Sequence, residues 1–413
     1  MNKIIRSGLA IAAFLTVFSI SGFSQKVKRT PFDVTNYVMN VSLVPAERRI
    51  SATVDVAFTP LEDTRGVEFE MNGSLKIDSI TRVDRTGSVS PAAKTSGRAT
   101  VSAATGSVTF VQDQTGVSDL GPSVRIDLGD TVVKGTPMVL RFKYSGILDS
   151  AQGGPLQTKR LAHIGDSQGY LMYAARWFPF HDYAADRATA DISISLPSGL
   201  QLVGYSDSPV TSIGGKYRFV QAKPGLIGNF AYGKYFSKTL RFGEYELQFN
   251  SRVSNDALIA SYGETLGKAF DNYTKRFGAP EAGKRLIIAQ IDDESLEYYS
   301  SLGMLFIGSR QFEEARDITT ERLQREAAYQ WWGLTVGLKS FDDAWLSQGL
   351  AEYSAFSLRE SGMDNSKLDA MRRELLEKAL TFEQTASLLR APAIGCAGAR
   401  TESWSSSVGL MSR

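Results

Sequence analysis

A glutamate between two residues that lie four positions apart marks the stretch Arg325-Glu326-Ala327-Ala328-Tyr329. Positions four apart share one face of a helix, and two histidines at such positions bind zinc in the H-E-x-x-H pattern, with the glutamate as general base. Here an arginine and a tyrosine stand at the two positions. Arginine is always protonated and a neutral phenol is a poor zinc ligand, so the stretch predicts the layout of a zinc helix without its ligands.

Two further runs follow at a characteristic distance, Gln-Trp-Trp-Gly at 330–333 and W-L-S-Q-G-L-A-E-Y at 345–353. Together the three runs resemble the aminopeptidase N family (peptidase family M1, gluzincin zinc metallopeptidases), in which QWWG precedes W-L-N-E-G-x-A-E-Y. The resemblance implies that Gln348 replaces the third zinc ligand and that Glu352 supports the site from behind. It identifies a degenerate member in which Arg325, Tyr329 and Gln348 occupy the ligand positions, so no cofactor is predicted, although active relatives bind zinc.

The same resemblance assigns two carboxylates. Residues 294–298 read Glu-Ser-Leu-Glu-Tyr where the family has G-x-M-E-N, which implies that Glu297 binds the free amino group of a peptide. The competing reading of Glu297 is a solvated carboxylate on an edge strand. Glu326 keeps the general-base position but is expected to be idle, because water that is not bound to a metal is far too weak an acid. The tract 401–408, where a catalytic tyrosine is expected, contains none.

The histidine, cysteine and basic residues of the chain do not suggest a second metal site, a cysteine nucleophile or a nucleic-acid site. The chain has two histidines, His163 and His181, without partners at metal-ligand spacing, and we expect both to be structural, His181 at the surface or in a loop. The single cysteine, Cys396, has no histidine nearby and is expected to be a bystander. No basic run with interleaved aromatic residues occurs, so a nucleic-acid partner is not predicted. Peptide N-termini are the expected partner.

The first 24 residues have the features of a signal peptide. Lys3 and Arg6 precede a short apolar run, 8–20, and small residues at 22 and 24 fit a cleavage site. The run is too short to cross a bilayer comfortably, so no transmembrane anchor is predicted beyond this segment, and an uncleaved anchor is the alternative. Cleavage leaves basic and acidic residues in equal number. We expect export to the periplasm or the exterior.

Hydrophobic periodicity divides the rest into a β domain at 25–248 and a mixed domain at 249–413. Alternation predicts strands at 37–43 and 50–58, joined by a turn at 45–49, and another at 192–196. Polar, small residues predict loops at 85–108 and 149–160. Helical spacing follows at 256–277, 319–336, 342–360 and 364–388, with a short buried strand at 286–289.

The resemblance implies a fold class for each domain. The first is expected to be an antiparallel, aminopeptidase N-like saddle domain, supported by Arg176-Trp177-Phe178-Pro179 and by Asp186-Arg187-Ala188-Thr189. The second is expected to be a thermolysin-like α+β domain, incomplete at its C-terminus. Since Gln348 and Glu352 are also four apart, both motif helices should turn these faces toward one cleft, with Glu297 on an edge strand beside it.

Four readings of function stay open at this point. The leading one is an exported aminopeptidase-like protein without catalysis that keeps a peptide cleft. Another is an active zinc aminopeptidase with atypical ligands. The third is a scaffold that docks a partner through its β domain, and the fourth is the product of a decaying gene.

Overall fold

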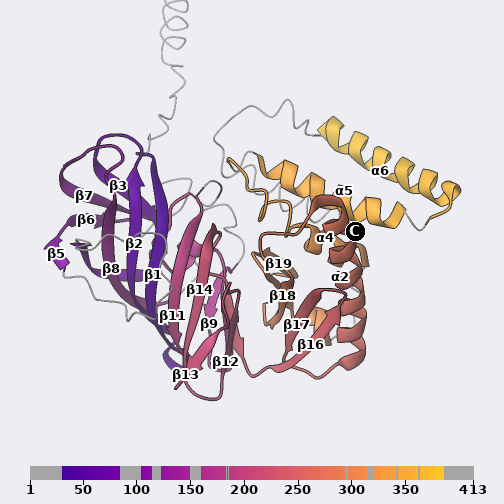
Figure 1. Cartoon of the computed structure of the whole chain (residues 1–413), viewed down its shortest axis with the longest axis horizontal. Coiled ribbons are helices and arrows are strands. Elements are labelled where there is room, and N and C mark those ends of the chain that lie inside the picture. The colour runs from indigo at the N-terminus through magenta and orange to yellow at the C-terminus, as the bar shows by residue number, and fades with distance from the viewer. Residues whose placement is uncertain are drawn as a thin grey trace, which may run out of the picture.

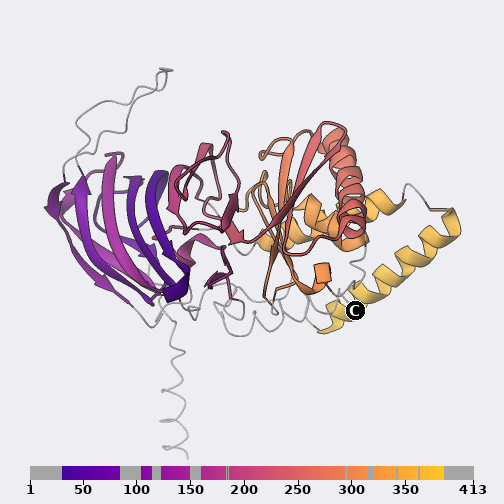
Figure 2. The same cartoon turned by 90° about the horizontal axis from the view of Figure 1, so that it is seen from below.

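The computed structural model describes residues 30–83, 104–113, 122–148, 160–182, 184, 186–293, 296–313, 320–340, 343–360 and 363–385. Strands dominate up to residue 233, and a smaller sheet with helices follows (Figure 1). The view from below shows the two parts side by side along the long axis (Figure 2). This arrangement agrees with the predicted order of a β-rich part followed by a mixed part.

Three sheets make up the β-rich part. The largest has eight strands in the order β13-β14-β11-β1-β2-β8-β4-β5, beside sheets β3-β7-β6 and β12-β15-β10-β9. The bounds are β1 Phe32–Val44, β2 Arg49–Pro60, β3 Thr64–Glu70, β4 Leu75–Val83, β5 Ala104–Ser107, β6 Thr109–Gln112, β7 Ser123–Val132, β8 Met138–Ile147, β9 Ala162–Ile164, β10 Gln168–Leu171, β11 Ala188–Ser195, β12 Gln201–Gly204, β13 Thr211–Ile213, β14 Lys216–Gly225 and β15 Phe230–Gly233.

The predicted hairpin between β1 and β2 is present. Tyr37 pairs with Val56 and Met39 with Val54, and these four side chains are buried on one side of the sheet. A short 3-10 turn, Pro45–Glu47, joins the strands, and the next residue adopts a left-handed conformation. β1 runs parallel to β11, whereas the other strand pairs of this sheet are antiparallel. The sheet is therefore mixed rather than purely antiparallel.

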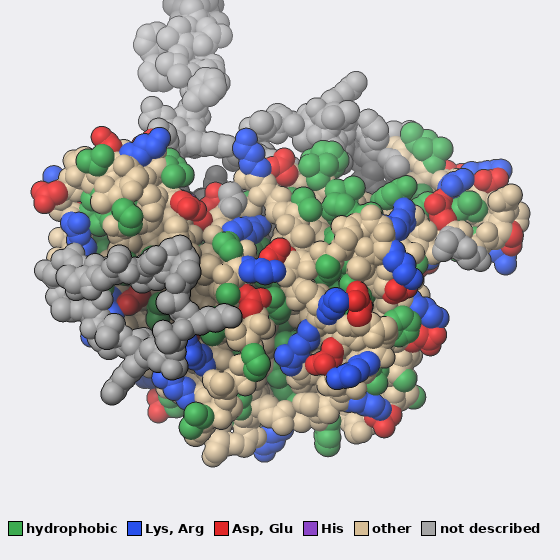
Figure 3. Space-filling model, in the orientation of Figure 1, with side chains coloured by type: hydrophobic (Ala, Val, Ile, Leu, Met, Phe, Trp, Pro, Cys, Tyr) green, Lys and Arg blue, Asp and Glu red, His purple; other side chains and the backbone are tan. Residues whose placement is uncertain are grey.

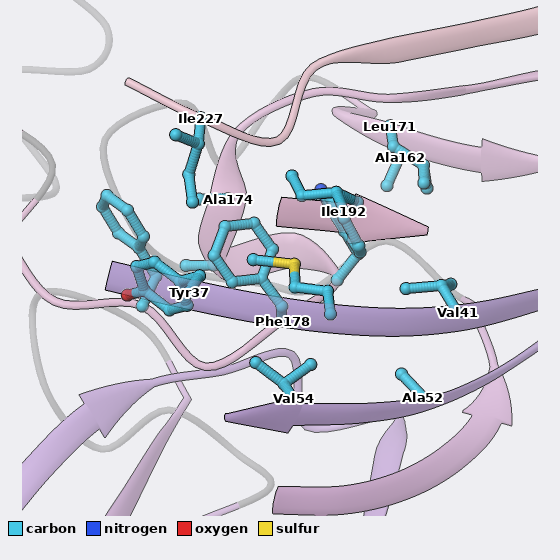
Figure 4. Close-up of a cluster of buried hydrophobic side chains, with 14 of the residues drawn as sticks. Tyr37, Val41, Ala52, Val54, Ala162, Leu171, Ala174, Phe178, Ile192 and Ile227 are labelled. Atoms are coloured by element: carbon cyan, nitrogen blue, oxygen red, sulfur yellow. The ribbon is translucent and has the colours of Figure 1, made fainter. Parts of the chain in front are cut away.

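The core of this part lies between the sheets. Aliphatic side chains from β1, β2 and β11 meet the segment that follows β10 (Figure 4). The Trp177 ring is fully buried there, and its indole N–H donates to the backbone oxygen of Gly228 at 2.9 Å. The Tyr144 hydroxyl donates to the backbone oxygen of Trp177 at 2.7 Å. Because both buried polar groups are bonded, the aromatic segment 176–180 packs here without leaving them unsatisfied.

The mixed part is built on a five-stranded sheet in the order β16-β17-β18-β20-β19. Its strands are β16 Phe236–Phe242, β17 Tyr245–Ser251, β18 Arg285–Ile291, β19 Tyr298–Ser301 and β20 Met304–Gly308. Helix α2, Asp256–Phe277, matches the prediction for 256–277 and packs on β16 and β17. Side chains at positions 263 and 267 of α2 would meet Leu240 and Phe242, so glycine at both lets the helix approach the sheet.

The remaining helices are α3 Arg310–Glu313, α4 Thr320–Ala328, α5 Ala344–Glu360 and α6 Asn365–Thr385. None of the helices described here is long and apolar enough to cross a membrane. Large apolar side chains gather on the outer side of α5 and on α6 (Figure 3), and the exposed ones are Trp345, Leu346, Leu350, Tyr353, Leu375, Leu376 and Leu380. The outer side of α5 is thus apolar. The polar side chains of Ser347, Glu352 and Ser354 lie on its other side, toward α4 and the segment that follows it.

Some expectations differ from the structure, and others lie outside the described residues. The change of sheet falls between Gly233 and Phe236, so the boundary expected at 248/249 lies inside β17, which pairs with β18. Part of the loop expected at 85–108 is strand β5, which pairs with β4. The loop expected at 149–160 lies outside the described residues except for its last position, as do the signal segment, Cys396 and the tract 401–408.

The helix expected at 319–336 ends earlier, at Ala328. The backbone N–H groups of Gln330 and Trp331 donate three residues back, to Ala327 and Ala328, which tightens the last turn. Gly333 then adopts φ 106°, a conformation that favours glycine. Helical periodicity continued past this point in the sequence because Trp331 and Trp332 are both packed, although they no longer belong to the helix.

Candidate functional site

Helix α4 is oriented by its apolar side. Leu323, Ala327 and Trp331 are buried in the same cluster as the inner face of α2. The indole N–H of Trp331 donates to the backbone oxygen of Gly278, just past the end of α2, at 2.8 Å, and its ring packs edge-on against Tyr273. With this side fixed against α2, the opposite side of α4, which carries Arg325 and Glu326, turns toward β19 and α5.

The connection after α4 brings α5 back against it. The indole N–H of Trp332 donates to the Ser354 hydroxyl at 2.9 Å, and the Ser347 hydroxyl donates to the backbone oxygen of Trp332 at 2.6 Å. A Cβ at position 333 would lie 2.6 Å from the Ser347 oxygen, so glycine is required on steric grounds as well. The two helices pack together, as the spacing of the motif runs predicted.

Arg325 lies at the centre of the facing surfaces. Its guanidinium forms an ion pair with Glu352 of α5, and a second guanidinium nitrogen lies 3.7 Å from Glu326 Oε1. The Arg325 side chain is 10% exposed. Burial acts to lower the pKa of this guanidinium, but the charges of Glu326 and Glu352 outweigh burial and raise it. Arg325 is therefore a fixed cation that compensates two carboxylates.

Glu326 is held at both carboxylate oxygens. Oε1 lies 3.2 Å from Nε of Arg322, one turn earlier in α4, and Oε2 accepts a hydrogen bond from the Ser300 hydroxyl of β19 at 2.8 Å. The Arg322 guanidinium also lies over the Tyr298 ring, 5.0 Å from its centroid. With only 6% of its side chain exposed and two arginines beside it, Glu326 is arranged as a structural anion.

Tyr329 and Gln348 complete the three ligand positions. Burial, followed by the charge of Glu326, raises the pKa of the Tyr329 phenol above its ordinary value, so the hydroxyl stays neutral. Gln348 is half-buried on α5, one turn before Glu352. Within the described residues no three His, Cys, Asp or Glu side chains gather as metal ligands do. A cation, a neutral phenol and an amide do not fit zinc, which requires imidazole, thiolate or carboxylate donors.

Glu297 lies in the bend before β19 and is exposed. Its backbone oxygen accepts a hydrogen bond from the Gly308 N–H at 2.9 Å, which fixes the bend against β20. In the described part of the chain no hydrogen bond or ion pair joins the side chain of Glu297 or of Gln348 to the cluster of Arg325, Glu326 and Glu352. The structure thus brings together four of the six predicted site residues, these three and Tyr329, by contact or mutual charge.

The two histidines lie in the β-rich part, away from this cluster. His181 lies in a loop, one of the two expected places, but it is mostly buried: its side chain is 14% exposed, its ring stacks on Phe32, and its Nδ1 lies 2.9 Å from Asp186. Phe32, which covers the His181 ring, lies 149 positions earlier in the sequence. The residues around His181 in the sequence therefore did not indicate that its side chain is buried. His163 lies beside Arg160, and burial followed by that positive charge lowers the pKa of its imidazole.

Two residues that hold Glu326 were not predicted. Arg322 lies four positions before Glu326, and this spacing on a helix is a recognisable signal for an ion pair. Ser300 has no such signal, because it reaches Glu326 from β19, and the pairing of β19 with β20 creates that contact. Only the tertiary structure could identify it.

Comparison with known proteins gives a fold-level answer. No family profile matches the chain, and no curated protein matches it. Among solved structures, the chain resembles an M1 zinc metallopeptidase from Deinococcus radiodurans with TM-score 0.60 and 16% sequence identity, covering 85% of this chain and 76% of that one. The fold is that of the M1 zinc metallopeptidases.

Structures of M1 zinc metallopeptidase mutants with bound ligands are similar to this chain to the same degree. A two-domain mutant bound to L-arginine matches with TM-score 0.61, 16% identity and coverage of 85% and 76%. A mutant of the Deinococcus radiodurans enzyme bound to a Tyr-Ser-Ala substrate matches with TM-score 0.60, 16% identity and coverage of 84% and 74%. The M1 fold thus carries amino-acid and peptide ligands in those proteins, and at this identity the likeness is one of fold alone.

Proposed function

We propose that this chain is an exported M1 aminopeptidase-like protein that lacks peptidase activity and binds peptide N-termini in the cleft beside α4 and α5. The single observation that carries the proposal is Arg325. Its guanidinium stands at the first metal-ligand position of the M1 pattern and pairs with Glu326 and Glu352. A second cation at that place would meet a fixed positive charge in a mostly buried setting.

Absence of hydrolysis follows from the same contacts. A peptidase of this class needs water whose pKa is lowered by zinc, and a carboxylate free to take its proton. Glu326 already accepts a hydrogen bond from Ser300 and lies beside Arg322 and Arg325. Proton abstraction by Glu326 would remove the negative charge that these two arginines stabilise, which opposes a general-base role.

Peptide binding rests on what remains polar and accessible. Glu297 is an exposed carboxylate immediately before β19, the strand that contacts α4 through Ser300. It stands at the amine-binding position of the M1 pattern, and a carboxylate suits the protonated amine of a peptide. The L-arginine and Tyr-Ser-Ala ligands of the similar structures support a ligand of this class.

The first test is zinc content together with turnover. We expect the purified mature protein to hold less than about 0.1 zinc per chain and to hydrolyse aminoacyl anilides no faster than background. The triple variant Arg325→His, Tyr329→His, Gln348→Glu tests whether the layout itself is intact, and we expect it to bind zinc. Stoichiometric zinc with chelator-sensitive turnover by the unaltered chain would establish the alternative, an active enzyme with atypical ligands.

The second test is calorimetric titration with a tripeptide and with its N-acetylated form. We expect the free-amine peptide to bind and the acetylated one to bind at least tenfold more weakly, because acetylation removes the charge that Glu297 would meet. Glu297→Gln should weaken the free-amine peptide by a similar factor. Glu264→Gln, an exposed carboxylate on α2, is the matched control and should change nothing. Equal affinity for both peptides, or no binding of either, would favour the scaffold reading.

Export is tested separately. If residues 1–24 are a cleaved signal, the mature protein recovered from the periplasm or the medium should begin at Gln25. Protein that keeps these residues and sediments with membranes would indicate an uncleaved anchor instead.

A further inference from the structure

A small cavity lies where the β-rich part meets the β19–β20 turn. Ile192, Phe219 and Phe230 line it from strands β11, β14 and β15, and Leu302 closes it from the turn between β19 and β20. The cavity leaves about 10 Å³ for the centre of a water molecule. This is about the smallest space that accommodates one water.

Two of the residues that line the cavity each carry a polar side-chain atom without a hydrogen-bond partner among the described residues. These atoms are the Nε2 donor of Gln221 on β14 and the Oδ1 acceptor of Asn229 just before β15. The Gln221 residue is only 8% exposed. A buried amide donor without a partner costs free energy comparable to a lost hydrogen bond, and the same holds for a buried amide oxygen. One of the two atoms donates and the other accepts.

We propose that this cavity is a binding site for one water molecule, which accepts a hydrogen bond from Gln221 Nε2 and donates one to Asn229 Oδ1. Water suits the site because it supplies both an acceptor and a donor within a space too small for a larger ligand. An apolar occupant would leave both amide atoms unsatisfied. The water joins two segments of the β-rich part directly beneath the turn that carries Leu302.

The cavity borders a turn of the mixed part. The turn at Leu302 and Gly303 is held from its other side by Gln330, whose side-chain oxygen accepts the Gly303 N–H at 3.0 Å and whose nitrogen donates to the Ser301 oxygen at 2.9 Å. Ser300, one residue earlier, holds Glu326. The proposed water site therefore adjoins, at Leu302, the turn that follows β19, the strand that carries Ser300.

A crystal structure at a resolution that shows ordered waters tests the site directly. We expect one density peak within hydrogen-bond distance of both Gln221 Nε2 and Asn229 Oδ1. Absence of this peak in a map that shows other buried waters, or amide side chains that turn away to bond elsewhere, would overturn the proposal.

Variants give an independent measure in solution. Gln221→Met and Asn229→Leu each remove one partner at similar side-chain volume, and each should lower the melting temperature by about 2 to 4 °C. The double variant removes both partners and should lower it by clearly less than the sum, because no polar atom is left unsatisfied. Gln201→Met, at an exposed position on β12, is the matched control. Strictly additive losses would contradict a shared water.

Discussion

Two buried polar clusters, one in each part of the molecule, join segments that are far apart in the sequence. In the β-rich part the Asp186 carboxylate accepts the Val34 N–H at 3.2 Å and lies 2.9 Å from the His181 imidazole, so it ties the start of β1 to the segment before β11. In the mixed part Arg325 ties Glu326 of α4 to Glu352 of α5. Both clusters are mostly shielded from water, but the basic group is an imidazole in the first and a guanidinium in the second.

The difference lies in which group can change its charge. Burial raises the pKa of the Asp186 carboxyl, although His181 and the Val34 N–H act in the opposite direction. This carboxyl can therefore change its protonation at a higher pH than an ordinary aspartate. The Arg325 guanidinium stays charged, because its pKa is raised further by Glu326 and Glu352. Asp186 is thus the group whose charge depends on pH, whereas Arg325 keeps its charge.

Removal of the fixed cation should have the largest effect. Arg325→Leu leaves Glu352 without its partner and Glu326 with Arg322 alone. We expect the free energy of unfolding to fall by about 2 to 4 kcal/mol, less than for a fully buried pair because Glu352 is partly exposed. Urea unfolding measures this loss. Arg372→Leu removes an exposed pair with Glu360 and should cost less than about 1 kcal/mol, and equal losses in both variants would contradict a buried compensating role.

The titrating cluster should show an intermediate effect that depends on pH. Because the folded-state pKa of Asp186 is raised above its ordinary 3.8, Asp186 contributes stability that is fully present below pH 3.8 and is lost as pH rises through the folded pKa. Asp186→Asn removes this dependence. Relative to wild type, the variant should gain stability as the pH rises from 3.5 to 6.5 in urea unfolding series. Parallel curves for the two proteins would show that Asp186 does not titrate there.

The smallest effect should come from the neutral contact to Glu326. Ser300→Ala removes the hydroxyl that donates to Oε2 but leaves both arginines in place. We expect a loss of about 1 kcal/mol in the free energy of unfolding, the usual value for one hydrogen bond. Ser212→Ala, at an exposed position on β13, is the control and should lie within about 0.5 kcal/mol of wild type. If Ser300→Ala lowered the free energy of unfolding as much as Arg325→Leu does, the charges of the arginines would not be the main stabilising contribution at Glu326.

Much of the architecture could be predicted from local patterns. Alternation placed the hairpin of β1 and β2, where Tyr37 and Val56 pair, and helical spacing placed α2 with its glycine after Phe277. The spacing of Arg325 and Glu352 within their motif runs also put both on facing helices. These features depend on periodicities of two and 3.6 residues, which are legible in a single sequence.

What could not be predicted depends on contacts between distant segments. The end of α4 at Ala328 is followed by a loop in which the Gly333 N–H donates to the Val336 oxygen and the Val336 N–H donates to the Trp331 oxygen. The two tryptophans continue the helical pattern of the sequence past this end, so periodicity did not reveal it. The burial of His181 depends on stacking with Phe32 across the sheet. The roles proposed for Gln348 and Glu297 stay predictions, since each is fixed by a ligand rather than by the packing of the fold.

At the junction of α4 and α5 the positive charge is supplied by a guanidinium, which is part of the chain. A metal centre exists in loaded and empty forms, and its occupancy follows the supply of free metal and the presence of chelators. Arg325 is part of the chain itself. Its ion pairs with Glu326 and Glu352 therefore form when α4 packs against α5 and require no added ion. The proposed absence of zinc therefore predicts a single form of this junction in zinc-poor and zinc-rich compartments alike.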